Sequence, residues 1–294
     1  MAISASLVKD LRDRTGAGMM DCKRALVEVD GDIDRAMDLL RQKGAASADR
    51  KSSRIASEGV IGQWIEQSGA AAVMMEVNCE TDFVAKDESF LKFVHELVNL
   101  ISDKHPENVQ QLGQMGLDSE RKVEDARLAL VGRIGENITI RRFQIIVAQP
   151  GSRLSGYLHG QRIGVIVGTN GGSTELGKDL AMHIAASRPL AVSEAELPEE
   201  ILERERKIVA AQAAETGKSE NIIDKIVSGR IKKFVADNTL LGQSYVKNTE
   251  ITVAELLQSE DGSVTSMLRY EVGEGLEKRE DDFVADVMAQ ARAG

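Results

Sequence analysis

A pattern of strand, strand, helix and later strand occurs twice along this 294-residue chain. In the first copy, strands are predicted at 58–65 and 71–77, a helix at 88–102 and a late strand at 137–143. The second copy has the same order, with segments at 155–160, 162–167, 174–186 and 266–272. Strands joined by a short turn pair antiparallel, and an amphipathic helix covers one face of such a sheet. The chain is therefore predicted to be an α+β protein with two related core subdomains, in which helices pack on antiparallel sheets.

Before the first copy, residues 1–44 predict three short helices. Each carries apolar residues at helical spacing, and turns containing glycine separate them. Gly44 is a plausible end for the third helix. Residues 45–58 are small, polar and basic, and they predict a linker that is helical only in part. A core of three short helices is only marginally stable alone.

Two helices, at 198–214 and 219–236, are predicted to interrupt the second copy, with a tight turn at 216–218. A projecting helical hairpin cannot bury both of its faces on itself. Either the body of the protein or a partner chain must cover it, and the sequence leaves both options open. The final residues, 277–294, carry apolar side chains at helical spacing and predict a short helix, docked on its own body or on a partner.

The composition disfavours several classes of function. The chain has 37 basic and 47 acidic side chains, a formal net charge of −10, and only 3% aromatic residues. Direct nucleic-acid binding needs basic residues against phosphates or aromatic rings against bases. No apolar run approaches the roughly 20 residues that span a bilayer, and no signal peptide is evident. We therefore expect a cytoplasmic protein in which Cys22 and Cys79 stay reduced.

No set of residues in the sequence suggests catalysis or metal binding. The four histidines lack metal-ligand spacing, and no nucleophile motif occurs. Residues 172–178 match the spacing of a phosphate-binding loop, but Asp179 follows where a serine or threonine is required. Its carboxylate would repel phosphates, so a polar turn before a helix is the better interpretation. We expect no enzyme activity, no cofactor and no metal.

Residues 77–86 place a large aromatic ring beside a carboxylate, in a loop after a predicted strand. In one interpretation, Thr81 caps a short helix and Phe83 packs inward. In the other, the loop is a rigid finger on which Phe83 anchors in a partner's pocket and Asp82 places a charge next to it. These residues alone leave both interpretations open.

Six segments, in one order over the whole chain, resemble the bacterial elongation factor Ts family, the nucleotide exchange factors of elongation factor Tu. They are residues 7–23, 81–84, 134–137, 157–160, 181–186 and 270–275. The resemblance implies a ubiquitin-associated-like three-helix module and two core subdomains, followed by two further modules. The implied boundaries are 1–52 for the first module, 53–148 for one core subdomain, 149–188 and 236–272 for the other, 189–235 for a helical-hairpin dimerisation insertion, and 273–294 for a C-terminal module.

The resemblance also implies which residues contact elongation factor Tu. Asp82 and Phe83, in the finger Thr81-Asp82-Phe83-Val84, would intrude near the magnesium and phosphate site of that partner. The other implied contacts are Arg12, Met19, Met20 and Lys23 on its nucleotide-binding domain, Ile134 and Gly135 beside the finger, and His159 and His183 elsewhere. For His183, an ordinary position on a helix surface is the alternative.

Met19 and Met20 support a binding surface independently of the resemblance. Adjacent helical residues cannot both point into one core, so at least one of these flexible thioethers must be exposed.

The function that follows is a guanine nucleotide exchange factor for GDP-bound and nucleotide-free elongation factor Tu, acting in translation elongation. It would promote GDP release by disturbing the magnesium and phosphate site of that partner. The resemblance also implies one arrangement in which two copies of the chain form a homodimer through the helical hairpin. The alternative is a regulatory protein that binds RNA through the basic residues 41–54, or a nucleotide at residues 172–178.

Overall fold

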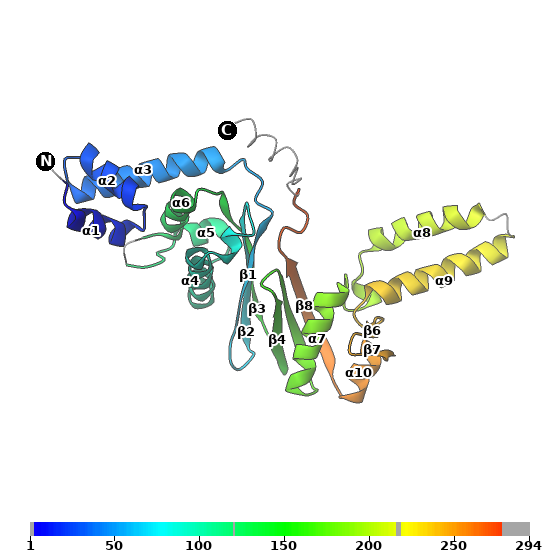
Figure 1. The fold of residues 1–294 in the computed structure, drawn as a ribbon. Coiled ribbons are helices and arrows are strands. Elements are labelled where there is room, and N and C mark those ends of the chain that lie inside the picture. Colours follow the sequence, from blue (N-terminus) through cyan, green and yellow to red (C-terminus); the bar gives the residue numbers. More distant parts are fainter. Residues whose placement is uncertain (1–2, 120, 216–218, 278–294) are drawn as a thin grey trace. The chain divides into compact units, whose positions relative to one another are not determined.

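The computed structural model describes residues 3–119, 121–215 and 219–277, and it confirms an α+β fold (Figure 1). Two three-stranded sheets have the strand orders β1-β2-β3 and β4-β5-β8, and a two-stranded sheet pairs β6 with β7. The chain forms two compact units. Among the described residues, the first comprises 3–62, 75–119, 121–144 and 271–277, and the second comprises 63–74, 145–215 and 219–270.

The first unit begins with the three predicted helices, α1 (Ala5–Thr15), α2 (Met19–Glu28) and α3 (Ile33–Lys51). The side chain of Ser4 caps α1 by accepting a bond from the third residue after it, and Asp32 caps α3 in the same way. Their shared core contains Val8, Leu11, Cys22, Ala25, Leu26, Val29 and Ala36.

Helix α3 continues past Gly44 to Lys51, so the predicted helix end is wrong. Residues 45–58 are helical in part, as expected, because α3 covers 45–51. A Cβ on Gly44 would lie 3.6 Å from the carbonyl oxygen of Leu128, and one on Gly132 would lie 3.9 Å from the Cα of Gly44. Two glycines therefore meet where α3 crosses α6 (Val123–Ile134). This close packing compensates for the low helix propensity of glycine.

The first sheet contains β1 (Glu58–Ile65), β2 (Ala71–Cys79) and β3 (Ile138–Val147). Helix α4 (Glu88–Lys104) packs on it so closely that a Cβ on Gly62 would lie 2.6 Å from the side chain of Val98. Two helices that the sequence analysis did not predict complete this unit. They are α5 (Val109–Gln114) and α6.

A buried carboxylate, Glu76, links β2 to two other parts of the first unit. It accepts bonds from Arg141 at 2.9 Å and Arg142 at 2.7 Å, both on β3, and from the backbone N–H of Gly273 at 2.8 Å. Gly273 has a φ of +72°, and a Cβ there would lie 2.2 Å from the carbonyl oxygen of Ser57. The segment after β8 is therefore held against the first sheet by charge-assisted hydrogen bonds.

The second unit repeats the arrangement of a helix on a sheet. Strand β4 (Ser152–His159) pairs antiparallel with β5 (Ile163–Asn170), and the third strand is β8 (Ser263–Glu271). Helix α7 (Thr174–Ser187) packs on β4 and β5. Three short elements that were not predicted lie between residue 238 and β8. They are β6 (Ser244–Tyr245), β7 (Asn248–Thr252) and α10 (Val253–Ser259).

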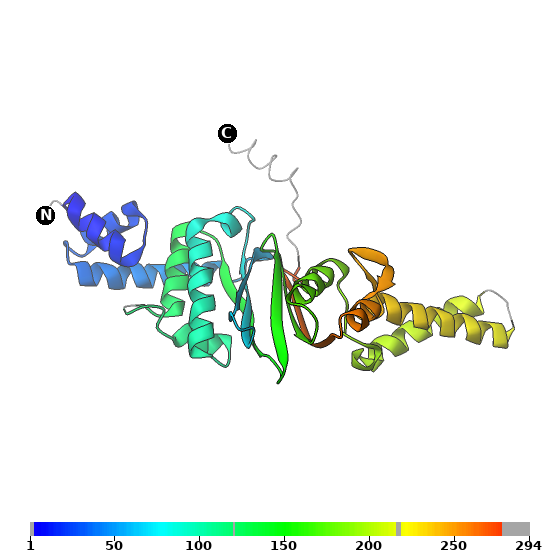
Figure 2. The same cartoon turned by 90° about the horizontal axis from the view of Figure 1, so that it is seen from below.

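The predicted helical hairpin is present in the second unit as α8 (Glu199–Ala214) and α9 (Glu220–Asn238), which run side by side (Figures 1 and 2). Val209, Ala213 and Ile231 are buried, whereas Ile208 and Ile222 are exposed. The turn predicted at 216–218 lies outside the described residues.

Of the C-terminal module expected at 273–294, the structure describes only 273–277, so the predicted final helix lies outside the described residues. Within the described part of the chain, no helix is both long and apolar enough to cross a membrane.

Candidate functional site

The finger is the connection between β2 and α4. A 3-10 turn, η1 (Val84–Lys86), lies within it, and the Thr81 side chain accepts a 3.4 Å bond from the backbone N–H of Val84. Asp87 then begins α4 by accepting bonds from the backbone N–H groups of Ser89 and Phe90. The Ser89 hydroxyl also donates to the Asp87 carboxylate. This bond is the main reason why the pKa of Asp87 lies below its usual value, and the two backbone bonds lower the pKa further.

Within this loop, the Phe83 ring points into solvent, while its two successors point inward. Phe83 is 80% exposed, whereas Val84 and Ala85 are buried. The residue before η1 is Phe83, so Thr81 bonds to the turn without being its N-cap, and the inward packing considered for Phe83 is wrong. Asp82 is also exposed and forms a 2.7 Å ion pair with Lys86, one turn later.

The base of the finger is held by a residue that the sequence analysis did not identify, Glu136. One carboxylate oxygen accepts the backbone N–H of Glu80 at 3.1 Å and of Thr81 at 3.0 Å. The other accepts the Thr81 hydroxyl at 2.7 Å. In the sequence, the only indication of a role for Glu136 was its place in one of the six family-like segments, residues 134–137.

Cys79, the last residue of β2, is buried under the finger. Its thiol donates a 3.2 Å bond to the carbonyl oxygen of Thr81. Burial, with a smaller contribution from the Glu136 carboxylate, raises the pKa of Cys79 to about 12. A thiol in this environment stays protonated at neutral pH, as expected for a structural cysteine.

Ile134 and Gly135 form the end of α6, directly before Glu136. Gly135 has a φ of +90° and donates its N–H to the carbonyl oxygen of Val131. This left-handed residue ends the helix and turns the chain toward the finger. The structure thus brings the segments 81–84 and 134–137 together, as their expected roles require.

On the three-helix module, Met19 and Met20 are 56% and 64% exposed. The prediction that at least one of them is exposed is confirmed, and both are. Arg12 on α1 and Lys23 on α2 are exposed as well. All four side chains are available to a partner.

His159 and His183, which belong to the second unit, differ in accessibility. His159 is exposed at the end of β4, and its Nδ1 lies 3.1 Å from the Tyr157 hydroxyl. His183 is fully buried, so neither the direct partner contact implied for it nor the alternative of a surface position matches the structure. His183 lies on the side of α7 that faces the region around β6, not on the side that faces solvent.

Hydrogen bonds on both ring nitrogens determine the state of His183. Its Nδ1 accepts the backbone N–H of Val246 at 3.3 Å, so Nε2 carries the proton and donates to the Gln243 side-chain oxygen at 3.0 Å. Burial lowers the pKa of His183 and favours this neutral form. His183 therefore joins α7 to the segment around β6.

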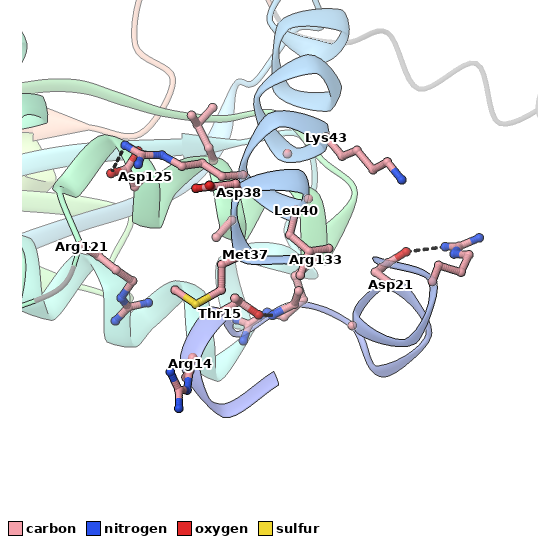
Figure 3. A pocket seen from close by; sticks show the side chains of 18 residues that line it. Arg14, Thr15, Asp21, Met37, Asp38, Leu40, Lys43, Arg121, Asp125 and Arg133 are labelled. Atoms are coloured by element: carbon pink, nitrogen blue, oxygen red, sulfur yellow. Dashed lines mark hydrogen bonds and ion pairs between the residues drawn. The ribbon is translucent and has the colours of Figure 1, made fainter. Parts of the chain in front are cut away.

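A cavity of about 490 Å³ lies between the three-helix module and α6, and six of its lining side chains are basic (Figure 3). Five of them already pair with carboxylates, which neutralises most of their charge. The pairs are Arg14–Asp10, Arg24–Asp21, Arg41–Asp125, Lys43–Glu28 and Arg121–Asp118. This pairing does not favour an anion site.

The segment that matches the spacing of a phosphate-binding loop is a capped helix start. Ser173 accepts the backbone N–H of Leu176 at 3.1 Å, and the Glu260 carboxylate accepts the N–H of Ser173 at 3.2 Å. Asp179 is used in bonds to Tyr245 and Lys247. A phosphate would have to displace one carboxylate and approach another, so the predicted polar turn is confirmed. Among the described residues, no group of three or more His, Cys, Asp and Glu side chains could hold a metal ion.

The elongation factor TS family model matches residues 80–274 of this chain. The chain is 50% identical over 292 residues to elongation factor Ts of Thioalkalivibrio sulfidiphilus, with 99% of each chain covered. It is 48% identical over 293 residues to elongation factor Ts of Methylococcus capsulatus, with both chains fully covered. A third relative, elongation factor Ts of Legionella pneumophila strain Lens, is 48% identical over 290 residues, with 99% of each chain covered. Since the similarity extends over nearly the whole sequence, the chain belongs to the elongation factor Ts family.

Proposed function

We propose that this protein is a guanine nucleotide exchange factor that binds elongation factor Tu and promotes GDP release during translation elongation. Family membership supports the partner, and the finger supports the mechanism. The single observation that carries the mechanism is the Phe83 ring, 80% exposed on a loop whose base is held by hydrogen bonds. An aromatic ring that a loop presents to water is available to anchor in a pocket of a partner.

The exchange follows from reciprocal coupling between two ligands of one partner. If the factor weakens GDP binding by some ratio, GDP weakens factor binding by the same ratio. A hundredfold effect corresponds to about 2.7 kcal/mol. Insertion of the ring beside the partner's magnesium and phosphate site would supply this coupling, because loss of magnesium leaves the diphosphate charge uncompensated. The factor performs no covalent chemistry.

Within this mechanism, each residue of the expected contact has a role. Phe83 displaces the partner segment that holds the magnesium ion, and Asp82 stabilises the altered arrangement, with Thr81 and Val84 on either side. Arg12, Met19, Met20 and Lys23 bind the nucleotide-binding domain, and Ile134 and Gly135 lie beside the finger contact. His159 contacts another part of the partner, and His183, which is buried, holds α7 against the segment around β6.

The same proposal extends to organisation and assembly. We assign residues 1–52 to the three-helix module that binds the partner. One core subdomain is 53–148, and the other consists of 149–188 together with 236–272. We assign 189–235 to a dimerisation insertion and 273–294 to a C-terminal module. Exposed Ile208 and Ile222 on the helical hairpin support pairing with a second copy. We place the protein in the cytoplasm, without direct nucleic-acid contacts.

The proposal is tested by release of a fluorescent GDP analogue from elongation factor Tu. Phe83→Ala should lower the catalysed release rate at least tenfold, which corresponds to about 1.4 kcal/mol. Asp82→Ala should also lower it. The control is Val147→Ala, which removes another exposed apolar side chain, 74% exposed, from the other unit. Release rates that stay unchanged in both finger variants would exclude the mechanism.

A further inference from the structure

The carboxylate of Glu136 accepts three hydrogen bonds from Glu80 and Thr81, where the finger begins. Two are backbone N–H groups, of Glu80 and Thr81, and the third is the Thr81 hydroxyl, at distances of 3.1, 3.0 and 2.7 Å. We infer that Glu136 is a positioning residue for nucleotide exchange, which keeps Phe83 presented to the partner. This inference rests on the proposed function of Phe83.

The interaction is reciprocal. The Glu80 side chain, which is only 9% exposed, accepts the backbone N–H of Asn137 at 2.7 Å. The Asn137 side chain is buried and donates to the carbonyl oxygens of Ser52 and Arg54, at 3.4 and 3.0 Å. The start of the finger, the turn after α6 and the segment after α3 are thus joined by one network of hydrogen bonds.

Phe83 depends on this network because its own side chain has little to pack against. A ring that is 80% exposed is not oriented by burial. The buried neighbours Val84 and Ala85 anchor the far side of the loop, and the bonds to Glu136 anchor the near side. Without the carboxylate, two backbone N–H groups and a hydroxyl lose their partner and the loop gains rotational freedom. A displacement of about 1 Å at a reacting surface can lower a rate a hundredfold.

A role limited to stability makes a different prediction. If Glu136 acts through Phe83, its substitution has no further effect once the ring is gone. If Glu136 only stabilises the fold, its effect multiplies with that of Phe83→Ala. A double-mutant cycle separates these two outcomes.

The experiment measures release of a fluorescent GDP analogue from elongation factor Tu, using full-length variants over a range of factor concentrations. Glu136→Ala should lower the maximal release rate ten- to hundredfold, with less than a threefold change in half-saturating concentration. Glu136→Gln should stay within about threefold of the unsubstituted protein, because its amide oxygen still accepts the N–H bonds of Glu80 and Thr81. In the Phe83→Ala background, Glu136→Ala should have no effect beyond about twofold.

Asn108→Ala is the matched control. It also removes a side chain that caps a backbone N–H group in the first unit, but at α5, where Asn108 accepts the N–H of Gln111 at 2.9 Å. If Glu136→Ala unfolds at the assay temperature, Thr81→Val replaces it, because this change removes the hydroxyl bond to Glu136 and keeps both N–H bonds to that carboxylate. It also removes the longer 3.4 Å bond from the backbone N–H of Val84. A normal maximal rate in a folded variant, or multiplying effects in the cycle, overturns the inference. An unchanged rate in Phe83→Ala alone instead overturns the proposed function.

Discussion

Phe83 lies in solvent although the two residues after it are buried. The 3-10 turn that starts at Val84 directs Val84 and Ala85 inward and leaves the preceding ring outside. Residue types alone do not predict this difference, because phenylalanine, valine and alanine are all among the residues most often buried. The orientation of the ring is therefore a property of the loop backbone, which Thr81 and Glu136 hold.

His183 is the residue whose environment differs most from the expectation. The small and apolar residues around it gave no indication that a polar ring fills the contact between α7 and β6. Its partners, Gln243 and Val246, lie about 60 residues later in the chain. Nearby Tyr245 also donates to Asp179 at 2.8 Å, and burial raises the pKa of Tyr245, so it stays neutral over the physiological range.

The buried His183 predicts a dependence of stability on pH. Its folded pKa lies below the ordinary 6.5, so the unfolded chain takes up a proton more readily. This stabilisation is present above pH 6.5 and is lost as the pH falls below it, by at most about 1.36 kcal/mol per pH unit. We expect the unfolding midpoint to fall more between pH 7.5 and 5.5 in the unsubstituted protein than in His183→Gln. The control is His159→Gln, a substitution at an exposed site, in which the unfolding midpoint should depend on pH as in the unsubstituted protein. If the midpoints of all three proteins change equally with pH, His183 does not have this role.

Helix α3 shows how tertiary contacts extend an element. Gly44, Ala48 and Lys51 lie on one face of α3, at spacings of four and three residues. Gly44 meets α6, Ala48 is buried, and the Lys51 ammonium group donates to the carbonyl oxygen of Val131 at 3.5 Å. The second half of α3 is therefore helical because α6 covers this face.

A charge on this face should disrupt the contact between α3 and α6. Ala48→Glu would bury an unpaired carboxylate, and we expect the free energy of unfolding to fall by about 2–3 kcal/mol. Ala46→Glu places the same side chain on the exposed face and should change stability by less than about 0.5 kcal/mol. Chemical denaturation measures both. Trypsin should also cut the Ala48→Glu variant faster near Lys51 and Arg54, and equal behaviour of the two variants would contradict the packing.

Helix α6 was not predicted, and its surroundings explain why. Helices α3, α4 and α5 all contact it, so its apolar side chains do not gather on one face. A helix covered on several sides lacks the single apolar stripe on which sequence analysis depends. Helices α4 and α7, in contrast, each cover one sheet, and both were predicted within two residues of their bounds.

At the scale of the whole molecule, the three-helix module is part of the first compact unit. The sequence analysis placed a partly helical linker, residues 45–58, after it. The ion pair between Arg41 and Asp125, at 2.8 Å, and the packing of Ala48 show that α3 is bound to the rest of this unit. The module and the finger are thereby parts of one packed body.

Removal of residues 1–50 should therefore have two effects. Association with elongation factor Tu should weaken, because the exposed methionines of the module are lost. The rest of the protein should stay folded, but its unfolding midpoint should fall by roughly 5 °C, because α6 loses the cover that α3 provides. Calorimetry of the truncated and full-length chains checks this, and an unchanged midpoint would show that α3 contributes nothing to the stability of the first unit.

The sequence by itself determined the α+β class, the two copies of the core pattern, the helical hairpin and the exposure of at least one methionine. These features follow from local periodicity and from turn residues, which act over short distances along the chain. The family-like segments also led to the prediction that 81–84 and 134–137 have functional roles, and the structure places Glu136 against Thr81.

Only the tertiary structure decided that α3 continues to Lys51, that Phe83 faces solvent, that His183 is buried and that Glu136 holds the finger. Each of these depends on groups more than 50 residues apart in the chain, such as Glu136 with Thr81 or His183 with Gln243. Local patterns carry no information on such pairs, because burial and hydrogen bonding between distant segments arise only when the chain has folded.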